Sequence, residues 1–230
     1  MGKTIKAAFP YTVPVLTGYL FVGIAYGILL QSKGFSFLWA GLMSAIIFAG
    51  SMQFVTVDLL TAPFAPLAAI LMTLMVNARH VFYGFSMLEK FNGMGKAKPY
   101  LIFALSDETF SLLYASEPPE GIDRKRFYLC IAILDQLYWI FGSMLGGLIG
   151  AGLALDVRGI DFVMTALFVS IFTEQLKNSA NRLPAFIGVM GSVLCLLLFG
   201  PDRFILPAMA VLVFVLSLVR KPLERRFDVQ

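Results

Sequence analysis

Charged side chains are scarce in this sequence of 230 residues. Asp, Glu, Lys and Arg together make up 14% of the chain, against 59% hydrophobic residues, and the mean hydropathy is +0.82. Soluble domains carry roughly 25% charged residues. Because so few polar side chains cannot cover a globule of this size, most of the outer surface must face lipid. The same composition excludes intrinsic disorder and a fibrous repeat.

Cysteine and histidine are also rare. The two cysteines, Cys130 and Cys195, sit in apolar runs without metal-ligand spacing, which excludes a secreted disulfide scaffold. A single histidine, no cysteine pair and no serine with an evident base argue against a metal centre or a catalytic triad. We therefore expect no cofactor and no enzymatic activity. The net charge of +4 is spread over short clusters, so nucleic acid is not an expected partner.

Long apolar runs are what the sequence has instead of charge. They are continuous rather than alternating, which favours transmembrane helices over a β-barrel. They predict an all-α polytopic membrane protein, a bundle of seven or eight transmembrane helices, because the last runs are near the shortest length that crosses a bilayer. The runs cover residues 7–32, 34–57, 59–78, 99–116, 127–155, 162–173, 183–200 and 204–219. The first is longer than the apolar core of a signal peptide, so it is expected to be retained.

The placement of Lys and Arg predicts the orientation. In an eight-span arrangement, eleven of these residues lie on the side of the termini and six on the other side. This bias favours cytoplasmic termini and a short basic cytoplasmic tail at 220–230. Three lysines between Leu88 and Pro99 fall on the opposite side. Residues 50–84 could therefore re-enter the membrane instead of crossing it twice.

The polar stretch at 117–126 is a natural joint within the chain. We expect a single membrane transport domain, 1–230, with candidate halves at 1–116 and 124–220. Glycine-rich helix ends followed by a second apolar segment recur in both halves. Duplicated halves with discontinuous helices are the plan of many secondary transporters.

Six ionisable residues lie inside the apolar runs or at their ends. A charged side chain at the bilayer centre costs about 2.5–3.5 kcal/mol, so such residues pair, line a wet cavity or sit near an interface. Asp58 precedes a turn sequence, and Glu174 could pair with Lys177, so a simple position at a helix end is an equal alternative for these two. Function explains the other four better. They are Arg79, Asp107, Glu108 and Asp135.

The densest polar cluster is Val-Asn-Ala-Arg-His-Val-Phe-Tyr-Gly at 76–84. Arg79 offers a fixed cation and several donors for a carboxylate, with Asn77 nearby. His80 could bind substrate or carry a proton near neutral pH. On a helix, Arg79 and Tyr83 would share one face. The helix could also break here and add backbone groups to the site, or the cluster could mark a helix end at the interface.

Two further segments carry polar groups into the interior. Gly50 and Ser51 allow a helix to unwind or to pack closely, and Gln53 adds an amide. In the segment 135–139, Asp135 and Trp139 share a helix face, which suits an ammonium group through a salt bridge and a cation-π contact. An interfacial aromatic anchor is the alternative. The substrate-binding candidates are Gln53, Asn77, Arg79, Asp107, Asp135, Tyr138 and Trp139.

Four blocks of the sequence resemble, in order and spacing, the AzlC family. They are Phe-Ala-Gly-Ser-Met-Gln-Phe at 48–54, Asn-Ala-Arg-His followed by Tyr-Gly at 77–84, Ser-Asp-Glu-Thr-Phe at 106–110 and Gln-Leu-Tyr-Trp-Ile-Phe-Gly at 136–142. The resemblance extends from about Pro14 to Leu216. Ser106 and Phe82 depart from what some relatives carry, and Asp135 has no clear counterpart in the family pattern, so the coupling carboxylate stays open.

The resemblance implies the large subunit of a branched-chain amino acid exporter of the LIV-E type in the bacterial inner membrane. Such a protein expels leucine, isoleucine, valine and sometimes methionine, driven by protons or the membrane potential. It works with a separately encoded AzlD-type membrane subunit of about 100 residues.

The hypothesis from the sequence is that a zwitterion is bound by opposite charges inside the membrane. Arg79 and Asn77 would take its carboxylate, and Asp107 or Asp135 its ammonium group. The proton-coupling candidates are His80, Glu108 and Glu174. Two alternatives stay open: a non-transporting membrane scaffold or sensor, and an exporter of a different small amphipathic metabolite.

Overall fold

The computed structural model describes residues 2–152, 159, 162–177, 182–200 and 204–218. Every regular element in these ranges is a helix, so the predicted all-α fold is confirmed. The helices are α1 (Gly2–Ser32), α2 (Phe37–Ile46), α3 (Gly50–Thr61), α4 (Pro66–Ser86), the 3-10 helix η1 (Gly95–Ala97), α5 (Lys98–Phe103), α6 (Asp107–Ala115), α7 (Arg124–Gly152), α8 (Phe162–Lys177), α9 (Arg182–Phe199) and α10 (Ile205–Leu218).

The chain forms two compact units, residues 1–164 and 165–230. In the second unit α9 and α10 pack against each other, and Gly191 lies against the side chain of Leu212. The first unit contains α1 to α7 and all but one of the residues predicted to form the site.

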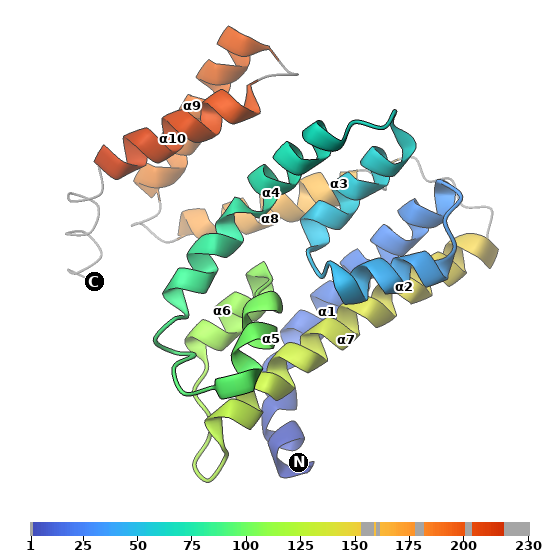
Figure 1. Cartoon of the computed structure of the whole chain (residues 1–230), viewed down its shortest axis with the longest axis vertical. Helices are drawn as coiled ribbons and strands as arrows, with labels where there is room; N and C mark the ends of the chain where they lie inside the picture. The colour runs from blue at the N-terminus through green and yellow to red at the C-terminus, as the bar shows by residue number, and fades with distance from the viewer. Residues whose placement is uncertain (1, 153–158, 160–161, 178–181, 201–203, 219–230) are drawn as a thin grey trace. The chain divides into compact units, whose positions relative to one another are not determined.

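The long helices α1 and α7 lie side by side along the first unit (Figure 1). They have 31 and 29 residues. At about 1.5 Å per residue each exceeds the roughly 30 Å of a bilayer core. Glycines let the two backbones touch: a Cβ atom on Gly27 would overlap the carbonyl oxygen of Ser143, and one on Gly146 would overlap that of Ile24. Small residues promote such close crossings between membrane helices.

Within the described residues, three helices are long and apolar enough to cross a membrane: α1, α7 and α9. Their outward side chains suit lipid, since Phe21 on α1 is 72% exposed and Leu197 on α9 is 79% exposed. Exposed apolar side chains of this size on most helices are what a membrane-embedded surface requires.

Three predicted spans are not continuous helices. The run at 34–57 divides into α2 and α3, with a break at 47–49, and the run at 99–116 divides into α5 and α6, with a break at 104–106. In the run at 59–78, α3 ends at Thr61 and α4 begins only at Pro66, so residues 62–65 connect two helices. A break near Gly50 was one of the two alternatives predicted for that segment, close helix packing being the other, whereas the interruption of 99–116 corrects the expectation of one helix. The alternative of a break within 76–84 is wrong, because α4 runs without interruption to Ser86.

Side chains satisfy the backbone at both breaks. Phe48, between α2 and α3, adopts a left-handed conformation with φ of 44°, which costs a non-glycine residue about 1–3 kcal/mol. The amide of Gln136 on α7 donates to the carbonyl oxygen of Ala45 at the end of α2 (2.9 Å). At the second break the hydroxyl of Ser106 accepts from the backbone N–H of Thr109 (3.1 Å), which is an N-cap.

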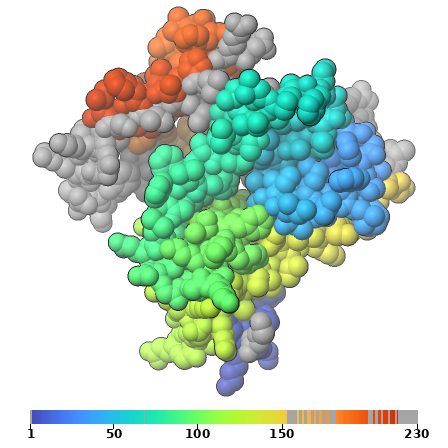
Figure 2. Space-filling model, viewed as in Figure 1, coloured from blue at the N-terminus to red at the C-terminus, as the bar shows by residue number. Residues whose placement is uncertain are grey.

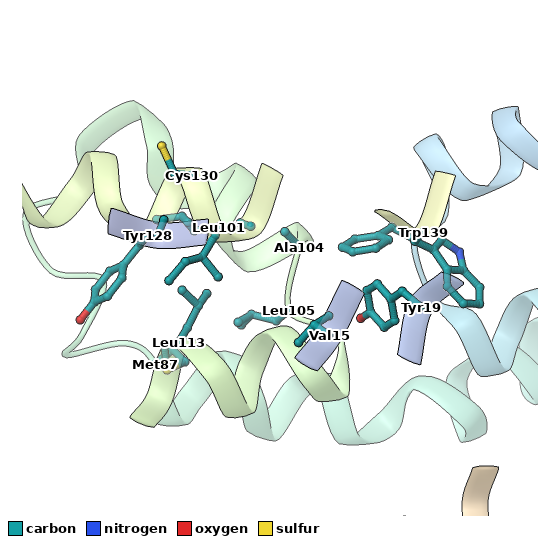
Figure 3. Close-up of a cluster of buried hydrophobic side chains, with 14 of the residues drawn as sticks. Val15, Tyr19, Met87, Leu101, Ala104, Leu105, Leu113, Tyr128, Cys130 and Trp139 are labelled. Carbon is teal, nitrogen blue, oxygen red and sulfur yellow. The ribbon is translucent and has the colours of Figure 1, made fainter. Parts of the chain in front are cut away.

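The apolar core lies where α5 and α6 meet α1 and α7 (Figure 3). Leu101, Leu105 and Leu113 fill it from the broken helix, and Tyr19 and Trp139 lie next to each other at one end. This end borders both breaks. Tyr19 packs against Phe48 and Trp139 lies against Gly50 at the first break, and the Tyr19 hydroxyl lies against Ser106 at the second. The packing therefore places an apolar wall beside the polar groups of the two interrupted helices.

Candidate functional site

Arg79 on α4 contacts the first turns of α3 and α6, the helices that follow the two breaks. Its Nε atom pairs with Asp107 Oδ1 at 2.8 Å, and its Nη2 donates to Ser51 Oγ at 2.7 Å. Ser51 lies in the first turn of α3 and Asp107 is the first residue of α6. The two charged side chains are 31% and 25% exposed, so the pair is accessible without lying on the outside. Two predicted site residues are thus direct partners of one another.

The face of α4 predicted to carry Arg79 and Tyr83 is confirmed. The Tyr83 hydroxyl donates to the same Asp107 Oδ1 at 2.6 Å. Its ring stacks on Phe110, with centroids 4.3 Å apart and planes at 9°. The teal surface of α4 and the green surface of α5 and α6 accordingly adjoin in Figure 2. Asp107 therefore receives a cation and a hydroxyl from one helix face.

Asn77 and His80 lie on the same helix but make few contacts. His80 Nδ1 is 3.2 Å from the carbonyl oxygen of Asn77, and its ring meets Tyr83 edge-on at 5.6 Å. The side-chain oxygen of Asn77 is buried and has no hydrogen-bond partner in the described part of the chain. A buried acceptor without a donor is costly, so this atom has capacity for a ligand.

Glu108 and Asp135 are joined by a series of hydroxyl groups. The Tyr19 hydroxyl donates to Glu108 Oε2 at 2.9 Å and also lies 2.5 Å from Ser106 Oγ. Ser106 and Thr109 hydroxyls are 3.0 Å apart, and Thr109 donates to Asp135 Oδ2 at 2.9 Å. Asp135 is fully buried. This carboxyl is therefore more deeply buried than the Arg79–Asp107 pair and is connected to Glu108.

A second polar group, made entirely of neutral side chains, surrounds Gln53. Trp139 Nε1 donates to Gln53 Oε1 (2.8 Å), and Gln53 Nε2 donates to Ser44 Oγ (3.0 Å). Ser44 donates to Ser143 Oγ (2.9 Å), which donates to the Trp139 carbonyl oxygen (2.8 Å). The indole ring also stacks on Tyr26. Gln53 and Trp139, both predicted for substrate, are thus buried and hydrogen-bonded to one another.

The remaining predicted residues lie apart from these groups. The Tyr138 hydroxyl is 3.0 Å from that of Thr12 on α1. Glu174 belongs to α8, and its side chain is outside the described residues. The described residues contain no group of three His, Cys, Asp or Glu side chains that could hold a metal ion.

Sequence reasoning missed the hydroxyl groups of this site. They belong to Tyr19, Ser51 and Thr109. Ser106 was noted only as a departure from some relatives, and its hydrogen bonds were not predicted. One signal was present: Ser-Asp-Glu-Thr at 106–109 places a capping serine before two acids in a first turn, which is typical of a helix N-terminus. That signal predicts a helix start in the middle of the apolar run.

Comparisons with known proteins agree with the family resemblance. The family described as AzlC protein matches residues 14–153. The branched-chain amino acid transport protein AzlC of Bacillus subtilis is 48% identical over 96% of this chain and 87% of its own length. An uncharacterized membrane protein of Helicobacter pylori (strain ATCC 700392 / 26695) is 43% identical over 96% and 97%, and the inner membrane protein YgaZ of Escherichia coli is 29% identical over 79% and 78%. No solved structure matches the chain.

The fold and the polar interior define a helical membrane protein with interrupted helices. In this architecture, ionisable groups are buried next to the helix ends at each break. Within that class, the chain belongs to the AzlC family.

Proposed function

We propose that this protein is the large subunit of a secondary transporter that exports branched-chain amino acids across the bacterial inner membrane. Three lines support the proposal: the family membership, the name of the Bacillus subtilis relative as a branched-chain amino acid transport protein, and the pair of opposite charges at the broken helices. Leucine, isoleucine and valine, with methionine as a further candidate, combine a zwitterionic head with an apolar side chain.

The observation that carries the proposal is the Arg79–Asp107 pair. Because the two groups already neutralise each other, a zwitterion can enter by exchanging one internal ion pair for two pairs with the substrate, and no charge is left alone in a medium of low dielectric. Arg79 takes the carboxylate with its planar donors, aided by the positive end of α3 next to Ser51. Asp107 takes the ammonium group.

Burial favours Asp107 over Asp135 for the ammonium group. Asp107 is 25% exposed and lies against Arg79, so both ends of one zwitterion can be reached together. Asp135 is fully buried and accepts from Thr109. The free side-chain oxygen of Asn77, two residues before Arg79, is a second acceptor for the ammonium group. The stacked rings of Tyr83 and Phe110 beside Asp107 suit an apolar side chain.

An AzlD-type subunit of about 100 residues is the proposed partner, and it follows from the family alone. The outward face of α4 is one surface available to it, because Leu74, Val81 and Phe85 are 65%, 58% and 67% exposed. Lipid covers the same face equally well. Loss of export on deletion of a neighbouring gene for a small four-helix protein would support the two-subunit arrangement.

Counterflow of labelled valine into membrane vesicles tests the binding roles. Arg79→Ala and Asp107→Asn are expected to abolish counterflow, and Arg79→Lys to reduce it strongly, because an ammonium group cannot reproduce the planar donors of arginine. Asp58→Asn is the matched control, since Asp58 is an exposed carboxylate near the end of α3. Wild-type rates in both Arg79→Ala and Asp107→Asn would refute the assignment.

The same experiment separates the two alternatives. A scaffold or sensor would give no counterflow with any substrate, while Arg79→Ala would still disrupt co-purification of a partner. An exporter of another amphipathic metabolite would leave valine counterflow absent while efflux of a different compound depends on Arg79. Competition with unlabelled leucine, isoleucine, valine and methionine ranks the substrates.

A further inference from the structure

Two carboxyl groups and three hydroxyl groups form one continuous series of hydrogen bonds in the first unit. The order is Glu108, Tyr19, Ser106, Thr109 and Asp135, drawn from α1, the second break with α6, and α7. We call this series the carboxyl chain. All four links have donor–acceptor distances between 2.5 and 3.0 Å, so each is a hydrogen bond by geometry.

The carboxyl chain lacks one proton if both carboxyl groups are ionised. Each of the four links needs a proton, but the three hydroxyls supply one each, and ionised carboxylates only accept. With Tyr19 donating to Glu108, and with Ser106 and Thr109 donating toward Asp135, no proton remains between Tyr19 and Ser106. Two oxygens would then face each other at 2.5 Å with nothing between them.

We propose that Glu108 and Asp135 share one proton through this chain. A single added proton completes every link in two ways. With Asp135 protonated, it donates to Thr109, and the donors then run in order to an ionised Glu108. With Glu108 protonated, all donors reverse and Asp135 is ionised. The two states interconvert when each of the four protons moves across its own hydrogen bond. The oxygen atoms keep their positions.

The burial of Asp135 supports a shared proton. Asp135 is fully buried, and its Oδ1 has no hydrogen-bond partner among the described residues. An ionised carboxylate with one oxygen unsatisfied is expensive in such a site, whereas the carbonyl oxygen of a neutral acid tolerates it better. Two ionised carboxylates joined by so short a chain would also repel each other.

The charged neighbours of the chain lie at its Glu108 end. Arg79 and Asp107 both act on Glu108, and they are paired with each other. At the other end, Tyr100 is the titratable neighbour of Asp135. A ligand that separates Arg79 from Asp107 therefore changes the field at Glu108 first and moves the preferred proton position between the two carboxyl groups.

This role for the chain rests on the proposed transport function. Glu108 follows Asp107 directly in the first turn of α6, so substrate charge and proton position are linked across one peptide unit. The carboxyl chain then carries the proton between a half-buried region near Glu108 and the buried region near Asp135. The sharing of the proton itself does not depend on which substrate is transported.

Infrared spectroscopy of the purified protein in lipid tests the shared proton without any substrate. Protonated carboxylic acids have a carbonyl-stretch band that ionised carboxylates lack. We expect one such band from this pair at neutral pH. It should be lost in both Asp135→Asn and Glu108→Gln, because the amide N–H of either substitute supplies the fourth proton and allows the other carboxyl group to ionise.

A second background separates the hydroxyl chain from a simple field effect. Thr109→Val keeps the shape of the side chain and removes the links to Ser106 and Asp135. In that background Glu108→Gln is expected to leave the Asp135 band unchanged. Tyr26→Phe is the matched control, because it removes another buried tyrosine hydroxyl of α1, one that donates to Met43 Sδ and lies outside the carboxyl chain. This variant should retain the band.

Three results would overturn the proposal. The first is absence of the band in the wild-type protein. The second is its persistence in Glu108→Gln, which would mean that Asp135 holds a proton of its own. The third is its loss on Glu108→Gln even in the Thr109→Val background, which would mean that the two carboxyl groups interact through space. Failure of valine counterflow, in contrast, would count against the transport function alone.

Discussion

The two interrupted helices of this protein are stabilised by different kinds of polar group. At the α2–α3 break, the neutral ring of Gln53, Ser44, Ser143 and Trp139 has one donor proton for each of its links. Each of the four links has its own donor and acceptor, so the ring is complete without an added proton. It fixes the position of the break and leaves nothing to titrate.

At the α5–α6 break, the corresponding polar group contains two carboxyls and is one proton short when both are ionised. It can be completed in two ways. In this protein, neutral amides and hydroxyls stabilise one break without an added proton. Where carboxyl groups take part, the other break can also hold a proton that moves between two sites.

Tyr19 is where the two breaks meet. Its ring contacts Phe48 and Trp139 edge-on, with centroids 6.3 and 5.4 Å apart. Its hydroxyl belongs to the carboxyl chain with Ser106 and Glu108. One side chain of α1 therefore packs against the α2–α3 break with its ring and joins the carboxyl groups of the α5–α6 break with its hydroxyl.

The largest expected effect is disruption of the helix pair on which both breaks depend. Gly27→Leu or Gly146→Leu forces a side chain into the backbone of the facing helix, since even a Cβ atom overlaps it. We expect a loss of at least 3 kcal/mol in the free energy of unfolding, because overpacking against backbone cannot relax. Thermal unfolding in detergent measures it. Gly18→Leu, with open space at its Cβ, should unfold like the wild type.

Removing the neutral ring should cost stability and nothing else. Gln53→Leu leaves the Trp139 N–H without its acceptor in a buried site and removes the amide that donates to Ser44 Oγ. We expect a loss of about 1–2 kcal/mol, within the range for interhelical hydrogen bonds and unsatisfied buried groups. The protonated-carboxyl band should be unchanged. A loss of that band in Gln53→Leu would remove the distinction between the two breaks.

The Arg79–Asp107 pair should contribute less to stability than to transport. Its two side chains are 31% and 25% exposed, so water screens the attraction. A double-mutant cycle with Arg79→Gln and Asp107→Asn should give a coupling energy of about 1 kcal/mol. Unfolding of the four proteins measures it. A coupling of several kcal/mol would indicate a purely structural pair and weaken the proposal that a zwitterion separates these groups.

The smallest effect belongs to an ion pair that lies outside the apolar runs and the helices, and serves as a reference for both breaks. Lys90 pairs with Glu117 at 2.9 Å and also donates to the carbonyl oxygens of Tyr114 and Ser116. The hydrogen bond from Lys90 lowers the pKa of the Glu117 carboxyl. Its contribution is therefore present at neutral pH and lost as the pH falls through the lowered value.

We accordingly expect Glu117→Gln to destabilise the protein slightly at neutral pH and not at all in acid. Lys90→Met should have the larger effect, because it also removes the bonds to the two backbone carbonyls. Melting temperatures of both variants at neutral and acidic pH provide the comparison. An effect of Glu117→Gln that grows in acid would contradict the sign of the pKa shift.

Much of the candidate site could be predicted because buried charge is costly. Arg79, Asp107, Glu108 and Asp135 stood out as ionisable residues within apolar runs, and the structure joins them in two neighbouring groups. The hydroxyl residues Tyr19 and Thr109 could not be found this way. Neutral hydroxyls are common in membrane helices and cost little there, so nothing in their local sequence distinguishes a bridging hydroxyl from a packing one.

The fold shows a similar limit. Hydropathy predicted the apolar segments and the all-α class, but it treated 99–116 as one span because both halves of a broken helix are equally apolar. Only the capping pattern at Ser106 distinguishes them. Gly50 and Ser51 allowed either a break or close packing near Phe48. The structure has the break, and the residue that adopts the left-handed conformation is Phe48 itself, held by contacts with Tyr19 and Phe103.

The sequence by itself determined that this chain is a helical membrane protein with a few ionisable residues inside, because the free energy of transfer from water to lipid depends on composition and run length. It also determined the family. Only the tertiary structure decided which charges are partners: Arg79 with Asp107, and Glu108 with Asp135 through three hydroxyls. The physical reason is that hydrogen bonds and ion pairs form only at distances of about 3 Å. The packing of α1, α4, α6 and α7, rather than spacing along the chain, decides which side chains come that close.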